Sequence, residues 1–187
     1  AEILPQYGIT TDLVDGTDLD QWAEALKTPA KAVFFESPSN PMLEIVDIAA
    51  VCELAHAAGA VVVADNAMAG PATQRPTEYG ADVVVYSTTK HIDGQGRTLG
   101  GAIMGSKEFI NGPVKTLIRN TGPTMSPFTA WTAIKGLETL RMRTEASAAS
   151  ALQVAEFLYA DPRVAEARYP WLPSHPQYDL ARAQMNS

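Results

Sequence analysis

The twenty residues Asp82–Gly101, DVVVYSTTKHIDGQGRTLGG, join an apolar segment to a glycine-rich one. Val83–Val85 are β-branched and apolar, a pattern typical of a buried strand. Three hydroxyl residues follow, and after them comes a single lysine, Lys90. Glycines then recur at positions 94, 96, 100 and 101. We expect the strand to end near the lysine and the glycines to let the backbone turn closely around it.

The placement of Lys90 distinguishes it from an ordinary surface lysine. A primary amine at the end of a buried strand can act as a nucleophile that forms a Schiff base with a carbonyl, provided that its site is sheltered and pre-positioned. The glycine spacing that follows matches neither a dinucleotide-binding fingerprint nor a Walker loop. His91 adjoins the lysine, and we interpret it as structural because neighbours in sequence usually point apart.

Two more apolar strands are expected before this one, at Ala32–Phe35 and Ala60–Ala64. A helix lies between them, with Asp47 as its N-cap and Gly59 at its end. The order is therefore strand, helix, strand, connector, strand. This order predicts an α/β fold with a mainly parallel sheet that has helices on both faces.

The remaining elements are simpler. They are a helix over 19–27 capped by Asp18, a strand over 102–104, a short helix near 107–119, and a long helix from Ser126 past Arg143 to about Tyr159. Alanine and serine become frequent near residue 142. We therefore expect a large domain over 1–142, and a linking helix with the start of a smaller C-terminal domain over 143–187.

Composition excludes several classes of function. The chain has 14 Lys and Arg against 21 Asp and Glu, a net charge of −7, which argues against nucleic acid as a partner. No apolar run is long enough to span a membrane, so no membrane partner is expected. The single cysteine, Cys52, falls on a helix face that is typical of core, and it fits a reducing, cytoplasmic location. No histidine pair has metal-ligand spacing, so we predict no metal.

Three polar residues are expected to meet at one edge of the sheet. Asn40, Asp65 and Lys90 each follow the carboxyl end of a successive apolar strand. In open α/β sheets, ligands bind beyond those ends. The sequence therefore predicts that these three side chains converge, although they are far apart along the chain.

Such a group of residues suits pyridoxal 5′-phosphate as the cofactor. Lys90 supplies the amine for its aldehyde, and a carboxylate against its pyridine nitrogen, here Asp65, lets the ring act as an electron sink. Ser87 and Thr89, two residues apart, can hold the phosphate, and Asn40 can donate to the ring oxygen. We predict Lys90 and Asp65 as catalytic residues, and all five as cofactor-binding.

Several motifs carry a family resemblance. They are FFESPSNP (34–41), VVVADN (61–66) and VVVYSTTKHIDGQGRTLGG (83–101). In combination they resemble the Cys/Met-metabolism family of pyridoxal phosphate enzymes, which have fold type I. The run KHIDGQGR (90–97), with GLETL (136–140) and YPWLPSHPQYDLARAQM (169–185), narrows the resemblance to members that add sulfide to an activated homoserine ester.

The resemblance implies an activity and an assembly. It implies γ-replacement on O-succinylhomoserine or O-acetylhomoserine, with sulfide as the acceptor and homocysteine as the product, in methionine biosynthesis. Cystathionine synthesis from cysteine and γ-elimination remain open, because they share the early steps. It also implies the five site residues above, Glu36 as support for the site, a small amino-acid substrate, and a homo-oligomer, either a dimer or a tetramer.

The family also implies a longer chain. Its members are about twice this length, and this chain begins at Ala1 without methionine and stops in a polar stretch. The family's phosphate loop, its stacking tyrosine and its arginine for the substrate carboxylate have no counterpart that we can place here. We therefore expect a central portion of such an enzyme, with little or no activity by itself. The rival interpretation from another class is a non-catalytic assembly subunit.

Overall fold

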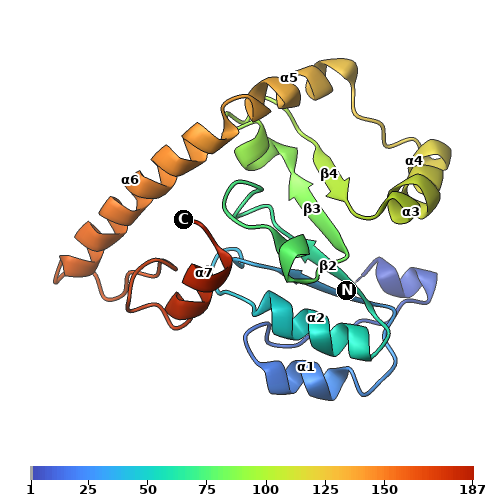
Figure 1. The fold of residues 1–187 in the computed structure, drawn as a ribbon, viewed down its shortest axis with the longest axis horizontal. Coiled ribbons are helices and arrows are strands. Elements are labelled where there is room, and N and C mark those ends of the chain that lie inside the picture. The colour runs from blue at the N-terminus through green and yellow to red at the C-terminus, as the bar shows by residue number, and fades with distance from the viewer. Residues whose placement is uncertain (1) are drawn as a thin grey trace.

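The structure, a computed structural model, describes residues 2–187 and is built on a four-stranded sheet (Figure 1). Its strands are β1 (Ala32–Glu36), β2 (Val61–Asp65), β3 (Val83–Ser87) and β4 (Gly101–Met104), in the order β1-β2-β3-β4. β1, β2 and β3 are parallel, and β4 is antiparallel to β3. The predicted α/β class and mainly parallel sheet are confirmed.

The helices follow the expected order. They are α1 (Leu19–Ala25), α2 (Ile48–Ala57), α3 (Lys107–Phe109), α4 (Lys115–Thr121), α5 (Pro127–Leu137), α6 (Leu140–Ala160) and α7 (Tyr178–Gln184), with shorter turns at Leu4–Tyr7, Pro76–Tyr79, Thr88–Ile92 and Ile110–Val114. Asp18 accepts hydrogen bonds from the backbone N–H groups of Asp20 and Gln21, and Asp47 accepts one from Ala50. Both predicted N-caps are therefore confirmed.

One face of the sheet is covered by α2, and α1 packs against α2 (Figure 1). The core on this face consists of alternate strand residues and one side of α2, namely Val33, Phe35, Val62, Ala64, Val84, Ile48, Val51, Cys52 and Ala55. Burial raises the pKa of the Cys52 thiol to about 11, which fits a core residue. On the opposite face, Phe34 is 61% exposed and Ile103 is 46% exposed. On the α2 side, Met104, the partner of Val84, is 54% exposed as well, so within residues 2–187 the cover of the sheet is incomplete on both faces.

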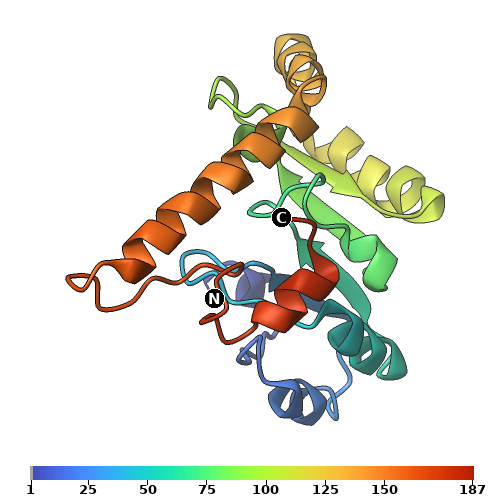
Figure 2. The same cartoon turned by 60° about the vertical axis from the view of Figure 1, so that its left-hand side comes forward.

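Our prediction of one long helix from Ser126 to about Tyr159 is wrong. The segment forms two helices, α5 and α6, with a break at residues 138–139. Thr139 has φ −116° and ψ 7°, outside the helical region. A Cβ at Gly136 would lie 2.2 Å from the carbonyl oxygen of Ile92, so α5 meets the turn after β3 backbone to backbone. Beyond the break, α6 extends away along one side of the molecule (Figure 2). The contact between Gly136 and Ile92 cannot be predicted from the local sequence, which shows only continuous helical periodicity.

Residues 169–187 pack against the part of the chain that contains the strands. The side chain of Gln184 donates to the carbonyl of Val46 (2.8 Å), and the backbone N–H of Asn186 donates to the carbonyl of Thr73 (2.8 Å). A second apolar cluster consists of Ile45, Ala69, Ala181 and Met185. The division into domains at residue 142 stays a prediction. No helix within residues 2–187 has the length and apolar character needed to cross a membrane.

Candidate active site

Lys90 lies in a tight turn immediately after β3. Residues 88–92 form one wide helical turn, which Lys90 interrupts with φ −83° and ψ −122°. The N–H of Asp93 donates to the carbonyl of Thr88 (2.8 Å), and that of Gly94 donates to the carbonyl of Lys90 itself (2.7 Å). Gly94 and Gly96 have φ of 73° and 64°, values that glycine adopts readily. The predicted use of these glycines is confirmed.

Asp93 stabilises the loop that follows this turn through hydrogen bonds. It is 1% exposed, and its carboxylate accepts hydrogen bonds from the backbone N–H (2.6 Å) and the Nε–H (2.8 Å) of Arg97. Burial acts to raise the pKa of the Asp93 carboxyl, but the bonds from Arg97 outweigh it and hold that pKa below its usual value. The carboxylate is therefore ionised at neutral pH, and it fixes the loop beside the lysine.

Lys90 lines a cavity of about 460 Å³ that three segments enclose. These segments are residues 67–68 after β2, residues 89–96 after β3, and the start of α6. The Nε2–H of His91 donates to the carbonyl of Met68 (2.7 Å) and so ties the first two segments together, which fits its structural interpretation. Lys90 itself is solvent-exposed, whereas the prediction expected a sheltered amine. Residues 2–187 supply walls for the cavity but do not cover its lysine.

Asp65 is the last residue of β2, where it is paired with Glu36 of β1 and Val85 of β3. It is half-buried, and its Oδ1 accepts a hydrogen bond from the N–H of Ala67 (2.9 Å). That bond holds the start of the loop that lines the Lys90 cavity. Asp65 and Lys90 thus lie at the carboxyl ends of adjacent parallel strands, as predicted from the order of elements.

Asn66 supports this edge of the sheet from inside, and sequence reasoning assigned it no role. It is fully buried, and its Nδ2 donates to the carbonyl of Gln74 (2.8 Å) and to the hydroxyl of Tyr86 (3.3 Å). Its Oδ1 accepts from Nε2 of Gln74 (3.1 Å). A polar residue directly after a buried strand was the available signal, since such a residue must find partners within the core.

The hydroxyl residues around the lysine differ in burial. Ser87 ends β3 opposite Gly101 of β4, and Thr89 lines the cavity with Lys90; both are half-buried. Thr88, between them, is buried, and its hydroxyl lies 2.7 Å from where a Cβ at Gly100 would stand. The accessible hydroxyls are therefore those predicted for the phosphate, a role that stays a prediction.

Asn40 lies in the loop after β1 and is exposed. Its backbone N–H donates to Oε2 of Glu36 (3.1 Å), so Glu36 holds this loop, in line with its expected supporting role. Asn40 does not line the Lys90 cavity, and the structure does not bring its side chain to the lysine. Its contact with a cofactor stays a prediction.

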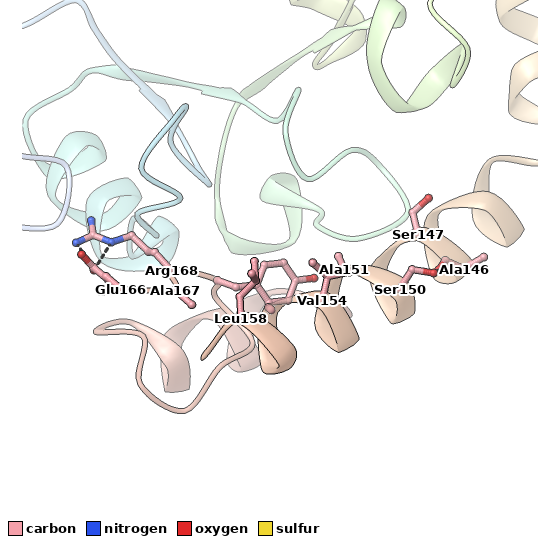
Figure 3. Close-up of a pocket in the computed structure, with 11 residues that line it drawn as sticks. Ala146, Ser147, Ser150, Ala151, Val154, Leu158, Glu166, Ala167 and Arg168 are labelled. Atoms are coloured by element: carbon pink, nitrogen blue, oxygen red, sulfur yellow. Dashed lines mark hydrogen bonds and ion pairs between the residues drawn. The ribbon is translucent and has the colours of Figure 1, made fainter. Parts of the chain in front are cut away.

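A larger cavity, of about 770 Å³, lies between α6 and residues 166–169 (Figure 3). Its walls include Val154 and Leu158 of α6, and the ion pair of Arg168 with Glu166 (3.0 Å) stands beside it (Figure 3). It contains none of the predicted site residues, so the smaller cavity is the candidate site.

Of the predicted site residues, Lys90 and Thr89 line the smaller cavity, whereas Asp65 and Ser87 end neighbouring strands at the same edge of the sheet without lining it. Together these groups fit pyridoxal phosphate in kind. An amine, a carboxylate and two accessible hydroxyls stand at the carboxyl ends of β2 and β3, where open α/β sheets bind ligands. The sheet with its helices is that of fold type I pyridoxal phosphate enzymes. The chain belongs to the family described as Cys/Met metabolism PLP-dependent enzymes, whose model matches residues 1–187.

Two relatives carry the same name. The O-succinylhomoserine sulfhydrylase of Mycobacterium tuberculosis is 62% identical over 186 residues, which cover 100% of this chain and 46% of the relative. That of Pseudomonas aeruginosa is 50% identical over 181 residues, 97% of this chain and 45% of the relative. Apo CalE6, a methionine gamma lyase from Micromonospora echinospora, superposes with a TM-score of 0.94 at 37% identity, over 98% of this chain and 50% of its own. The chain thus spans about half the length of the relatives that it matches.

Proposed function

We propose that residues 1–187 carry the lysine and the ring-binding carboxylate of a pyridoxal phosphate enzyme that acts at the γ-carbon of an activated homoserine. The observation that supports this most is the placement of Asp65 and Lys90 at the carboxyl ends of neighbouring parallel strands. The hydrogen bond from His91 to Met68 adds to it, because it joins the loops that follow the two residues. This placement is compatible with a functional lysine, so Lys90 need not be an ordinary surface residue.

The cofactor, when bound, supplies an aldehyde for an amine and a pyridine ring that withdraws electrons from the substrate's α-carbon. Lys90 would bind it through Nζ, and the same nitrogen would later take the proton from the substrate's Cα. The carboxylate of Asp65 would keep a proton on the pyridine nitrogen. Ser87 and Thr89 would hold the phosphate through their hydroxyls, with Asn40 at the ring oxygen.

The reaction we propose is γ-replacement: O-succinylhomoserine and hydrogen sulfide give homocysteine and succinate. The Cγ–O bond breaks and a Cγ–S bond forms, one sulfide proton leaves with succinate, and no oxidant or reductant is needed. Support comes from the two sulfhydrylases that share 62% and 50% identity with this chain. The alternative is γ-elimination, and the gamma lyase that superposes with a TM-score of 0.94 supports keeping it open.

The choice of acceptor tests the reaction. In the protein as the cell makes it, supplied with the cofactor, O-succinylhomoserine and sulfide, we expect homocysteine and succinate in equal amounts. With cysteine in place of sulfide, or with water alone, we expect much slower turnover. A preference for cysteine would instead indicate a cystathionine synthase. Formation of 2-oxobutanoate and ammonia with no acceptor would indicate a lyase, and either result would contradict the proposal.

Residues 1–187 alone are expected to show little or no turnover in the same assay. Catalysis of this kind depends on a site from which water is excluded, and Lys90 is exposed in residues 2–187. Measurement of homocysteine over a day, with the cofactor present, checks this. Ordinary turnover by the isolated chain would contradict the expectation. An assembly role without chemistry would require, in addition, that no cofactor attaches to Lys90.

A further inference from the structure

Arg143, in the first turn of α6, reaches the turn that carries the lysine. Its Nη2 donates to the carbonyl oxygens of His91 (3.1 Å), Ile92 (3.3 Å) and Gly136 (2.8 Å), and its Nε donates to the hydroxyl of Thr139 (3.1 Å). Arginine side chains commonly bind the free carbonyls at the end of a helical turn. Here one guanidinium binds the end of the lysine turn and the break between α5 and α6 at once.

The glycine loop is shaped around this guanidinium. A Cβ at Gly94 would lie 1.7 Å from Nη1 of Arg143 and 2.4 Å from its Cζ. Gly94 also has a φ of 73°, which side chains other than glycine rarely adopt. The two observations agree that the loop is packed directly onto the arginine, since neither the space nor the backbone leaves room for another residue.

Arg143 and Arg141, both in the first turn of α6, have different contacts. Arg141 is exposed and bonds to Glu145 (2.7 Å), an ordinary pair one helical turn apart. Arg143 is half-buried, and within residues 2–187 its partners are neutral oxygens only. Hydrogen bonds from an ionised donor are about twice as strong as neutral ones. The contacts of Arg143 therefore hold the backbone beside Lys90, whereas the ion pair of Arg141 joins two residues of α6 itself.

We propose that Arg143 is a positioning residue for Lys90, which keeps the turn in the conformation that presents the lysine amine to the cavity. This inference rests on the proposed use of Lys90 in binding pyridoxal phosphate. Without the guanidinium, two carbonyls directly after the lysine lose their donor, and the space above Gly94 empties. The turn then samples other conformations, and the amine spends less time in the reactive one.

Two matched variants, Arg143→Ala and Arg141→Ala, test the proposal by attachment of the cofactor. Each full chain is incubated with pyridoxal phosphate, reduced with borohydride and digested, and the label at Lys90 is compared with that at the exposed Lys31 in the same sample. For Arg143→Ala we expect the ratio to fall by about tenfold or more, since small misplacements cost about a hundredfold in reactivity. For Arg141→Ala we expect no change. An unchanged ratio in Arg143→Ala, or an equal fall in both variants, overturns the proposal.

Chemical rescue separates positioning from general loosening. Guanidinium ion at millimolar concentration fits the space that Arg143→Ala leaves above Gly94 and can donate to the same carbonyls. We expect it to restore part of the Lys90 label in this variant and to leave Arg141→Ala unchanged. A ratio that stays low with guanidinium assigns the effect to lost packing and contradicts a positioning role.

A measurement without cofactor keeps this inference distinct from the proposed function. We expect amide exchange at Asp93 and Gly94 to be about tenfold faster in Arg143→Ala, with the β2 amides as protected as before. If the β2 amides also lose protection, the alanine variant is loosened as a whole, and Arg143→Lys replaces it in each comparison. Lysine keeps the positive charge of arginine but cannot donate to several carbonyls at once as the planar guanidinium does. If wild-type Lys90 takes no label, the proposed function fails, and amide exchange still decides on Arg143. Unchanged exchange at both amides overturns the inference.

Discussion

Lys90→Ala is expected to lose covalently attached pyridoxal phosphate completely while the chain stays folded. Only a primary amine forms an imine with the cofactor's aldehyde, and alanine has none. The side chain of Lys90 is exposed, and substitutions of this kind usually change the free energy of unfolding by no more than about 0.5 kcal/mol. After borohydride reduction, the wild-type peptide that contains Lys90 should gain the mass of pyridoxal phosphate less one oxygen atom. The variant should show no such gain.

Lys135→Ala is the matched control for this experiment. Lys135 is on α5 and bonds to Glu138 (2.7 Å) at the surface, so its loss should leave the label at Lys90 unchanged. A Lys90→Ala chain that still binds one equivalent of cofactor at another lysine would show that the assignment of Lys90 is wrong. So would a wild-type chain in which the label is spread evenly over the exposed lysines.

The parts of this fold that sequence predicts are those with a local physical cause. Asp18 and Asp47 cap helices through bonds to N–H groups two or three residues away, and a reader of the sequence can see both partners. The strands follow from apolar, β-branched runs, although β1 and β2 each end one residue later than predicted. Because of that shift, Asp65 lies in its strand and not after it. The carboxyl ends of β2 and β3 still share one edge of the sheet, so the shift leaves the basis of the site prediction unchanged, and the roles of the site residues stay a prediction.

The parts that sequence does not predict depend on contacts between distant segments. An arginine in a long helical pattern gives no sign that it binds carbonyls near residue 92, and Arg143 was therefore treated as an ordinary helix residue. The break after α5 has the same origin, because it forms where Gly136 meets Ile92. The sequence also did not predict the exposure of Lys90. An apolar strand before a lysine does not indicate which other segments cover the lysine side chain.

Gly136→Ala is expected to destabilise the chain, although alanine is the better helix former. In an exposed helix the exchange would stabilise by about 1 kcal/mol. Here the new Cβ would lie 2.2 Å from the carbonyl oxygen of Ile92 and 3.0 Å from Cα of Asp93, and backbone atoms cannot move aside as a side chain can. Overpacking typically costs about 1–3 kcal/mol, and more where backbone must shift. We expect a net loss of about 2 kcal/mol, measured by urea unfolding.

Gly112→Ala supplies the control, because a Cβ at Gly112 would meet nothing within 4 Å. Because Gly112 lies in the helical turn Ile110–Val114, that variant should be as stable as the wild type or up to about 1 kcal/mol more stable. The clash at Gly136 has a second consequence, since it pushes α5 away from the turn that Arg143 and Gly136 together hold against the sheet. The label at Lys90 should therefore fall in Gly136→Ala under conditions where the chain is still folded, and not in Gly112→Ala. If Gly136→Ala were as stable as the wild type, α5 and the lysine turn would not be in backbone contact, and the support we assign to Lys90 from α5 would be wrong.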